Sequence, residues 1–278
     1  MTEHAEASLA PPPEAAFDFQ GRTVFVAGGS SGINLSIAEA FARRGANVSI
    51  ASRSPERVAA AVERLRSHGG RAEGWSADVR DAGSIGAALA AAHESFGPID
   101  VLISGAAGNF VAPALGMSSK GFRTVVDIDL VGTFNVLRSA HEFLRRPGAS
   151  VINISAPQAA NPTPYQAHVC AAKAGVDMLT RVLAMEWGVD GVRVNSIVPG
   201  PIGDTEGVRR LAPGPEALAA MAASIPLGRF GRTEDVALMA LMLSSPWSSF
   251  VTGAVIPVDG GSSLAGGRDL SSALKPAA

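Results

Sequence analysis

The sequence predicts a single α/β domain in which a doubly wound, seven-stranded parallel sheet carries helices on both faces. The chain of 278 residues combines 47% hydrophobic with only 17% charged residues, as expected when a sheet is buried on both faces. Short β-branched runs alternate with helical segments of roughly 10–15 residues, which is the pattern of βαβ units with right-handed crossovers. No repeat or linker divides the sequence, so we expect one domain.

The first unit of this pattern contains a glycine-rich turn. An apolar run at 24–26 predicts a strand, glycines follow at 28, 29 and 32, and apolar residues then recur at helical spacing. A strand, a glycine turn and a helix bring N–H groups of the helix N-terminus against a pyrophosphate, as in Rossmann-type folds. The turn could also be a tight connection without a ligand. In the nucleotide-binding interpretation its contacts are Gly28, Ser30, Ser31, Gly32 and Ile33.

The other elements follow from the same kinds of signal. Apolar runs predict strands at 47–52, 72–77, 99–104, 150–155, 193–198 and 254–258. Helical spacing, with Ser, Asp or Thr as the cap and Gly or Pro as a stop, predicts helices at 54–67, 81–96, 118–144, 165–187 and 233–243. Ser54 before Pro55 and Glu56 is the clearest start, because Pro suits the first helical position and an acid favours the first turn. Thr233 is expected to cap the last helix.

Domain boundaries follow from composition. We expect a disordered N-terminal tail at 1–16, one domain at 17–262 and a C-terminal tail with little order at 263–278. Within the domain, the glycine- and proline-containing segment at 203–230 is expected to form a mobile cover over the substrate.

Several classes of protein are disfavoured. The net charge of −2 gives no electrostatic reason to bind nucleic acid or an anionic membrane. The single cysteine, Cys170, excludes an intrachain disulfide and suits a reducing compartment. The sequence has no signal-peptide pattern, no apolar run of the ~20 residues that span a bilayer, and no metal-ligand spacing. We therefore predict a cytoplasmic protein without a metal.

Short segments along the chain also form a family pattern. They are the glycine turn at 28–32, Asp78-Val79, the turn from Gly105 to Gly108, Asn153-Ile-Ser155, Lys173, Asn195 with Pro199-Gly200, and Asp259-Gly260-Gly261. Over roughly 20–262 the chain thus resembles short-chain dehydrogenases/reductases. Within that family, the segments at 106–110, 127–129, 132–135, 200–202 and 205–211 look like those of peroxisomal-type 2,4-dienoyl-CoA reductases.

The resemblance implies an activity, an assembly and further contacts. It implies reduction of 2,4-dienoyl-CoA thioesters to 3-enoyl-CoA in the β-oxidation of unsaturated fatty acids, by a homotetramer with the apolar helix 165–187 at an interface. Lys173 would hold the hydroxyls of the nicotinamide ribose. Other implied cofactor contacts are Asp78, Val79, Ala106, Pro199, Gly200 and Ile202.

Four features, at five positions, depart from the family pattern. Asn34 replaces the third glycine of the turn, and Ser104 and Gly105 stand where asparagines are usual. Val169 stands where the family has its catalytic tyrosine, and Ala156 stands where the family has the partnering serine. Because valine has no proton to give, a plain ketone reductase or alcohol dehydrogenase is disfavoured. Conjugate reduction tolerates the loss better, since its charge develops on a thioester oxygen and a carbon is protonated afterwards.

Four residues are candidates for the chemistry. Asp129 stands where an asparagine is usual and could relay a proton near Lys173, although a structural hydrogen bond is nearly as plausible. His168 and Tyr165 could contact the thioester or a water, or simply pack at the start of a helix.

Substrate and cofactor contacts complete the prediction. Asn109 and Phe110 are expected in the substrate pocket, and Arg209 and Arg210 could meet the phosphates of CoA, with Arg229 as a further candidate. Arg53 at the end of the second strand, with no acid beside it, favours the 2′-phosphate of NADP(H) over NAD. Two alternatives remain: a short-chain reductase of another activated carbonyl or enone, and a catalytically silent NADP-binding protein.

Overall fold

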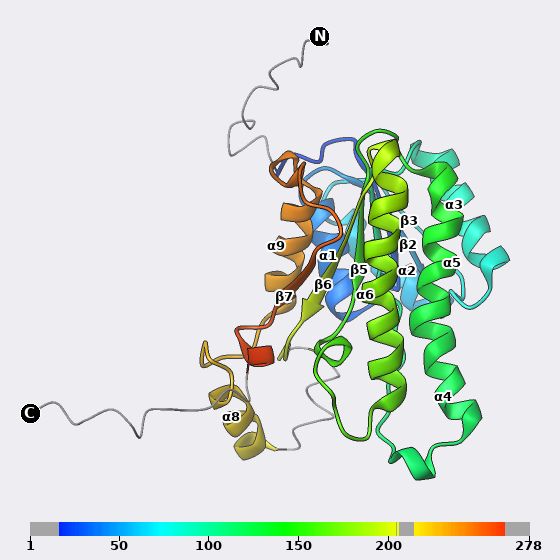
Figure 1. Cartoon of the computed structure of the whole chain (residues 1–278). Helices are drawn as coiled ribbons and strands as arrows, with labels where there is room; N and C mark the ends of the chain where they lie inside the picture. The colour runs from blue at the N-terminus through cyan, green and yellow to red at the C-terminus, as the bar shows by residue number, and fades with distance from the viewer. Residues whose placement is uncertain (1–16, 204, 206–213, 265–278) are drawn as a thin grey trace, which may run out of the picture.

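In the computed structural model, residues 17–203, 205 and 214–264 are described, and they form the predicted parallel sheet (Figure 1). Its seven strands lie in the order β3-β2-β1-β4-β5-β6-β7, with every neighbouring pair parallel. The strands are β1 (Thr23–Ala27), β2 (Asn47–Ser52), β3 (Ala72–Ser76), β4 (Val101–Ser104), β5 (Ser150–Ile154), β6 (Arg193–Pro199) and β7 (Val255–Val258). Each predicted strand is confirmed to within two residues. The strand order reverses between β1 and β4, and a crevice for a nucleotide forms at such a switch point.

Helices cover both faces of the sheet. One face carries α1 (Gly32–Ala42), α2 (Pro55–Arg66) and α9 (Thr233–Ser244), and the other carries α3 (Ala82–Phe96), α5 (Gly132–Ala140) and α6 (Ala167–Trp187). Two further helices, α4 (Ser119–Val126) and α8 (Pro215–Ala223), lie at the carboxyl end of the sheet. No helix among the described residues is long and apolar enough to cross a membrane.

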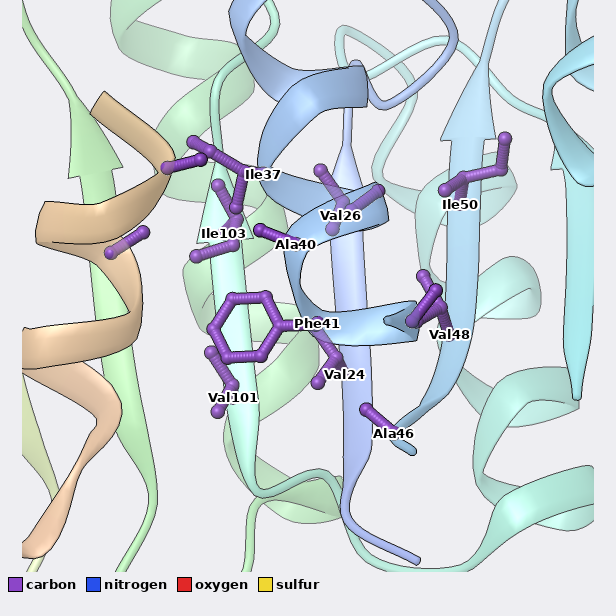
Figure 2. Packing of buried hydrophobic residues seen from close by; sticks show 14 of the residues in the cluster. Val24, Val26, Ile37, Ala40, Phe41, Ala46, Val48, Ile50, Val101 and Ile103 are labelled. Carbon is purple, nitrogen blue, oxygen red and sulfur yellow. The ribbon is translucent and has the colours of Figure 1, made fainter. Parts of the chain in front are cut away.

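The core is divided by the sheet into two apolar clusters. Side chains alternate along β1, so that Val24 and Val26 pack against α1 and Phe25 faces the opposite layer. Phe41 and Ile37 of α1 pack into the same cluster: in Figure 2 the Phe41 ring lies between Val24 and Val101 of β4, and Ile37 lies beside Ile103 of β4. Both α1 side chains are fully buried, and burial of each such side chain stabilises the fold by about 1.5–3 kcal/mol. This packing holds the glycine turn rigidly at the end of β1.

The predicted helix at 118–144 is interrupted. Between α4 and α5 the residues Asp127–Val131 form a turn of π-helix, and a 3-10 turn follows α5 at His141–Phe143. A π-turn inserts an extra residue into the helix and so rotates the side chains within it. Here it turns Asp129 into the interior, where its carboxylate accepts a hydrogen bond from the Gly108 N–H at 2.7 Å.

Three smaller predictions differ from the structure. Thr233 does not cap α9; the residue before the helix is Arg232, whose N–H donates to Asp235. The long helix begins at Ala167, not at Tyr165. Ser262–Leu264 form a 3-10 turn where little order is expected, because Asp259 accepts the Ser263 N–H.

Candidate active site

Two adjoining cavities open at the carboxyl edge of the sheet. One, of about 440 Å³, lies beside the glycine turn and the ends of β2 and β3. The other, of about 590 Å³, lies between the π-turn, the end of β5 and α6. Ala107, Gly108 and Asn109, which follow β4, line both. The pair therefore forms one continuous site for two molecules that meet at these residues.

The first cavity fits the phosphates and adenosine half of a dinucleotide. Gly28 has φ +81°, and a Cβ there would come within 2.9 Å of the Ala106 backbone. Gly32 has φ +56° with open space beside it. No side chain caps the N-terminus of α1, so its N–H groups are free to bind a pyrophosphate. The predicted contacts Gly28, Ser30, Ser31, Asp78, Val79 and Ala106 all line this cavity, whereas Gly32 lines neither.

Two arginines lie at the far end of this cavity. Arg53 is there as predicted, and Arg57 joins it from the first turn of α2. The sequence analysis missed Arg57, although an arginine in the first turn of the helix that follows Arg53 was a usable signal. The one carboxylate in the lining, Asp78, is paired with Arg80, and this guanidinium holds the pKa of Asp78 below its usual range. The end of the cavity thus offers two cations and no unpaired acid.

The second cavity contains a buried ion pair. Asp129 is 1% exposed and Lys173, on α6, is 5% exposed; Nζ lies 3.4 Å from Oδ2. Lys173 also donates to the Ile154 carbonyl at 3.0 Å. With the Gly108 N–H on the other carboxylate oxygen, both charges have hydrogen-bonding partners, as a buried pair requires. Among the described residues that line this cavity, Asp129 and Lys173 are the only ionisable ones.

The second cavity has no hydroxyl at the two positions where the family pattern has a catalytic tyrosine and its partnering serine. Val169 and Ala156 both line it, and Val169 stands one helical turn before Lys173. Tyr165 does not take over their role. It lies before α6 with φ +66°, is 61% exposed, and lines neither cavity. The structure therefore does not bring Tyr165 to the candidate site.

His168 is buried behind the site. It is fully buried and packs against Phe110, with ring centroids 4.3 Å apart. Neither ring nitrogen has a hydrogen-bonding partner in the described part of the chain. Desolvation lowers the pKa of His168, so it stays neutral at pH 7. His168 lines neither cavity, which favours the packing interpretation, and Phe110 also lines neither, so the structure does not place it in the predicted substrate pocket.

The remaining predicted contacts divide into three groups. Ile33, Pro199, Gly200 and Ile202 line the second cavity, and Asn109 lines both. Arg209 and Arg210 lie outside the described residues. Arg229 is paired with Asp235 at 2.9 Å, so its charge is already partnered. Lining residues that the sequence analysis missed include Asn34, Ser155, Gln158, Asn161, Thr163, Thr205 and Met221. Thr205 and Met221 come from the predicted cover segment.

A switch-point crevice, a glycine turn and a lysine held beside the second cavity define a nicotinamide-dependent oxidoreductase. The chain belongs to the short-chain dehydrogenase/reductase family. A family model described as enoyl-(acyl carrier protein) reductase matches residues 27–263. A dehydrogenase/reductase structure from Sinorhizobium meliloti has a TM-score of 0.83 at 34% identity, covering 89% of this chain and 97% of that one. A variant of actinorhodin polyketide ketoreductase, solved with NADPH, has a TM-score of 0.82 at 28% identity, covering 87% and 97%.

Curated relatives narrow the similarity further. The peroxisomal 2,4-dienoyl-CoA reductase [(3E)-enoyl-CoA-producing] of Pongo abelii is 47% identical over 246 residues, which cover 87% of this chain and 84% of that protein. The enzyme of the same name from Arabidopsis thaliana is 41% identical, covering 90% and 87%. Both names assign those proteins to peroxisomes, whereas the sequence analysis predicts a cytoplasmic protein.

Proposed function

We propose that this chain is an NADPH-dependent 2,4-dienoyl-CoA reductase that forms 3-enoyl-CoA. The observation that carries the proposal is the second cavity, where Asp129 and Lys173 are the ionisable lining groups and Val169 and Ala156 stand where hydroxyls would be needed for carbonyl reduction. The names of the curated relatives support the same substrate class.

NADPH is the proposed cofactor because of the first cavity. Arg53 and Arg57 can form charge-assisted hydrogen bonds to a 2′-phosphate. The N–H groups at the start of α1 would hold the pyrophosphate, and Lys173 would hold the nicotinamide ribose. When bound, this cofactor supplies a hydride. NADH lacks the 2′-phosphate and so would lose the contacts of both arginines.

Residues of the chain would stabilise the negative charge that develops on the substrate and deliver the proton that completes the reduction. To yield a 3-enoyl product, hydride adds at C5 and a proton at C2, which leaves the double bond between C3 and C4. Between these events negative charge lies largely on the thioester oxygen and must be met by donors. Asn109, where the two cavities meet, is the proposed donor. Asp129, beside the Lys173 ammonium and working through water, is the proposed relay for the proton.

An assay of NADPH oxidation separates this proposal from its alternatives. The purified chain is given 2,4-hexadienoyl-CoA, a 2-enoyl-CoA or a panel of small ketones, with NADPH or NADH. We expect turnover of the dienoyl-CoA with NADPH and a 3-enoyl product by NMR. Faster turnover of ketones would favour reduction of another carbonyl, and NADPH binding without any turnover would favour the silent cofactor-binding protein.

We also propose a homotetramer, located in the cytoplasm. Apolar side chains on α6 are exposed in the single chain, among them Met178 (56%), Val182 (41%) and Met185 (82%). An exposed stripe of this kind suits an interface between copies. Light scattering should give four times the chain mass, and Met185→Glu should lower it. A fluorescent fusion observed in cells tests the location.

A further inference from the structure

Three carboxamides from separate segments form a hydrogen-bonded chain beside the site. Gln158 lies in a 3-10 turn after β5, Gln166 immediately precedes α6, and Asn109 follows β4. Gln158 Nε2 donates to Gln166 Oε1 at 3.0 Å, and Gln166 Nε2 donates to Asn109 Oδ1 at 3.2 Å. Gln166 is only 4% exposed and lines neither cavity, whereas its two partners line the second.

The chain has a direction, because a carboxamide accepts through its oxygen and donates through its nitrogen. Gln166 uses its oxygen toward Gln158, so its NH₂ group faces Asn109. That NH₂ group occupies the oxygen of Asn109. The NH₂ group of Asn109 is then left for a ligand at the place where the cofactor and substrate cavities meet.

A fixed donor is valuable in this cavity because two of its hydroxyl donors are committed to backbone carbonyls. The Thr163 hydroxyl donates to the Asn161 carbonyl and the Thr205 hydroxyl to the Ile202 carbonyl. Val169 and Ala156 supply none. If the Asn109 carboxamide turned over, its oxygen would face the negative charge that develops on the thioester.

We propose that Gln166 is a positioning residue that orients the Asn109 carboxamide so that Nδ2 donates to the thioester oxygen of a dienoyl-CoA. This inference rests on the function proposed above. Gln166 touches neither substrate nor cofactor; it acts through Asn109. Loss of one donor to a developing oxyanion typically costs 10²–10³-fold in turnover, and a loosely held donor should recover only part of that.

A double-mutant cycle tests this role. Gln166→Met keeps the length of the side chain without polar atoms, and Gln166→Glu keeps its shape but replaces the donor with an acceptor. We expect Gln166→Met to lower kcat for 2,4-hexadienoyl-CoA by about tenfold or more, with NADPH affinity unchanged, and Gln166→Glu to lower it at least as much. In an Asn109→Ala background the additional effect of Gln166→Met on kcat should be less than about twofold, because coupled residues are not additive. Equal losses in both backgrounds, or a loss accompanied by weaker NADPH binding, would overturn the proposal.

A binding measurement separates this inference from the proposed function. The dienoyl-CoA is bound together with NADP⁺, which cannot reduce it, and its ultraviolet absorbance is recorded. Donation to the thioester oxygen should shift the band to longer wavelength in the wild type, and Gln166→Met should remove most of the shift. A shift that Gln166→Met removes, in a protein without turnover, would reject the function and retain the role of Gln166. Turnover together with a shift that Gln166→Met leaves in place would retain the function and reject the role of Gln166. Failure of the dienoyl-CoA to bind would reject both the function and that role.

Discussion

The side-chain amide of Asn34 donates to the carbonyl of Gly105 at 2.8 Å and lies close to the Gly28 carbonyl at 3.4 Å. A Cβ on Gly105 would collide with the Asn34 carboxamide. Two departures from the family pattern that look unrelated in the sequence are therefore one arrangement. The asparagine fills the space that the glycine leaves, and it ties the turn after β1 to the turn after β4.

This arrangement predicts a compensating pair of substitutions. Gly105→Asn alone should lower the free energy of unfolding by about 1–3 kcal/mol, because it overpacks the contact. Adding Asn34→Gly should recover most of the loss, since it vacates the space. Thermal unfolding measures both. Gly86→Asn on α3 is the control, because the nearest atoms to its Cβ are 3.9 Å away. A double variant no more stable than Gly105→Asn would contradict the arrangement.

Arg53→Ala and Arg57→Ala should each weaken NADPH binding by about tenfold or more. Each removes a charge-assisted hydrogen bond of roughly 1.5–3 kcal/mol, while NADH affinity should hardly change. Fluorescence titration with both cofactors measures this. Arg66→Ala on the same helix is the control, because its guanidinium bonds Glu63 and the Ala72 carbonyl instead. Equal losses for both cofactors would rule out recognition of the 2′-phosphate.

Lys173→Ala should weaken NADPH binding and abolish turnover together. The same substitution should also lower the free energy of unfolding, because Asp129 would stay buried without its cation. Breaking a buried ion pair typically costs about 3–5 kcal/mol. Titration and thermal unfolding of the same preparation measure the two effects. Lost turnover with unchanged NADPH affinity would show that the lysine takes part directly in the chemistry.

Asp129→Asn should lower turnover of a dienoyl-CoA at least about a hundredfold, because general acid–base help is typically worth 10²–10⁴-fold. A modest loss of stability should accompany it. The amide can still accept the Gly108 N–H, but its NH₂ group would face the Lys173 ammonium. Asp127→Asn, two residues earlier, is the matched control. Turnover within about threefold of wild type would mean that Asp129 is purely structural.

Stability should fall between pH 7 and pH 5 through His168. Burial lowers its pKa in the folded state below the ordinary value of 6.5. In this range the unfolded chain binds a proton that the folded chain does not. The contribution of His168 to the free energy of unfolding is therefore fully present above the unfolded pKa and is lost as the pH falls toward the folded pKa. His168→Gln should flatten the dependence, as measured by urea unfolding at each pH. Identical slopes for both proteins would contradict a neutral buried imidazole.

The sequence by itself determined the sheet, its seven strands, the glycine turn and the position of Arg53 at the end of the second strand. These depend on signals between near neighbours, namely apolar runs, glycines that permit positive φ, and charges at strand ends. Lys173 beside the site also follows from a local pattern on one helix. The missing hydroxyls at Val169 and Ala156 were visible for the same reason.

Only the tertiary structure decided how the side chains meet. It turned Asp129 inward through a π-turn, exposed Tyr165, buried His168, and joined Gln166 to Asn109 across 57 positions and Asn34 to Gly105 across 71. A hydrogen bond between distant segments depends on orientations set by the packing of several elements at once, and periodicity within one segment carries no information about its partner's orientation.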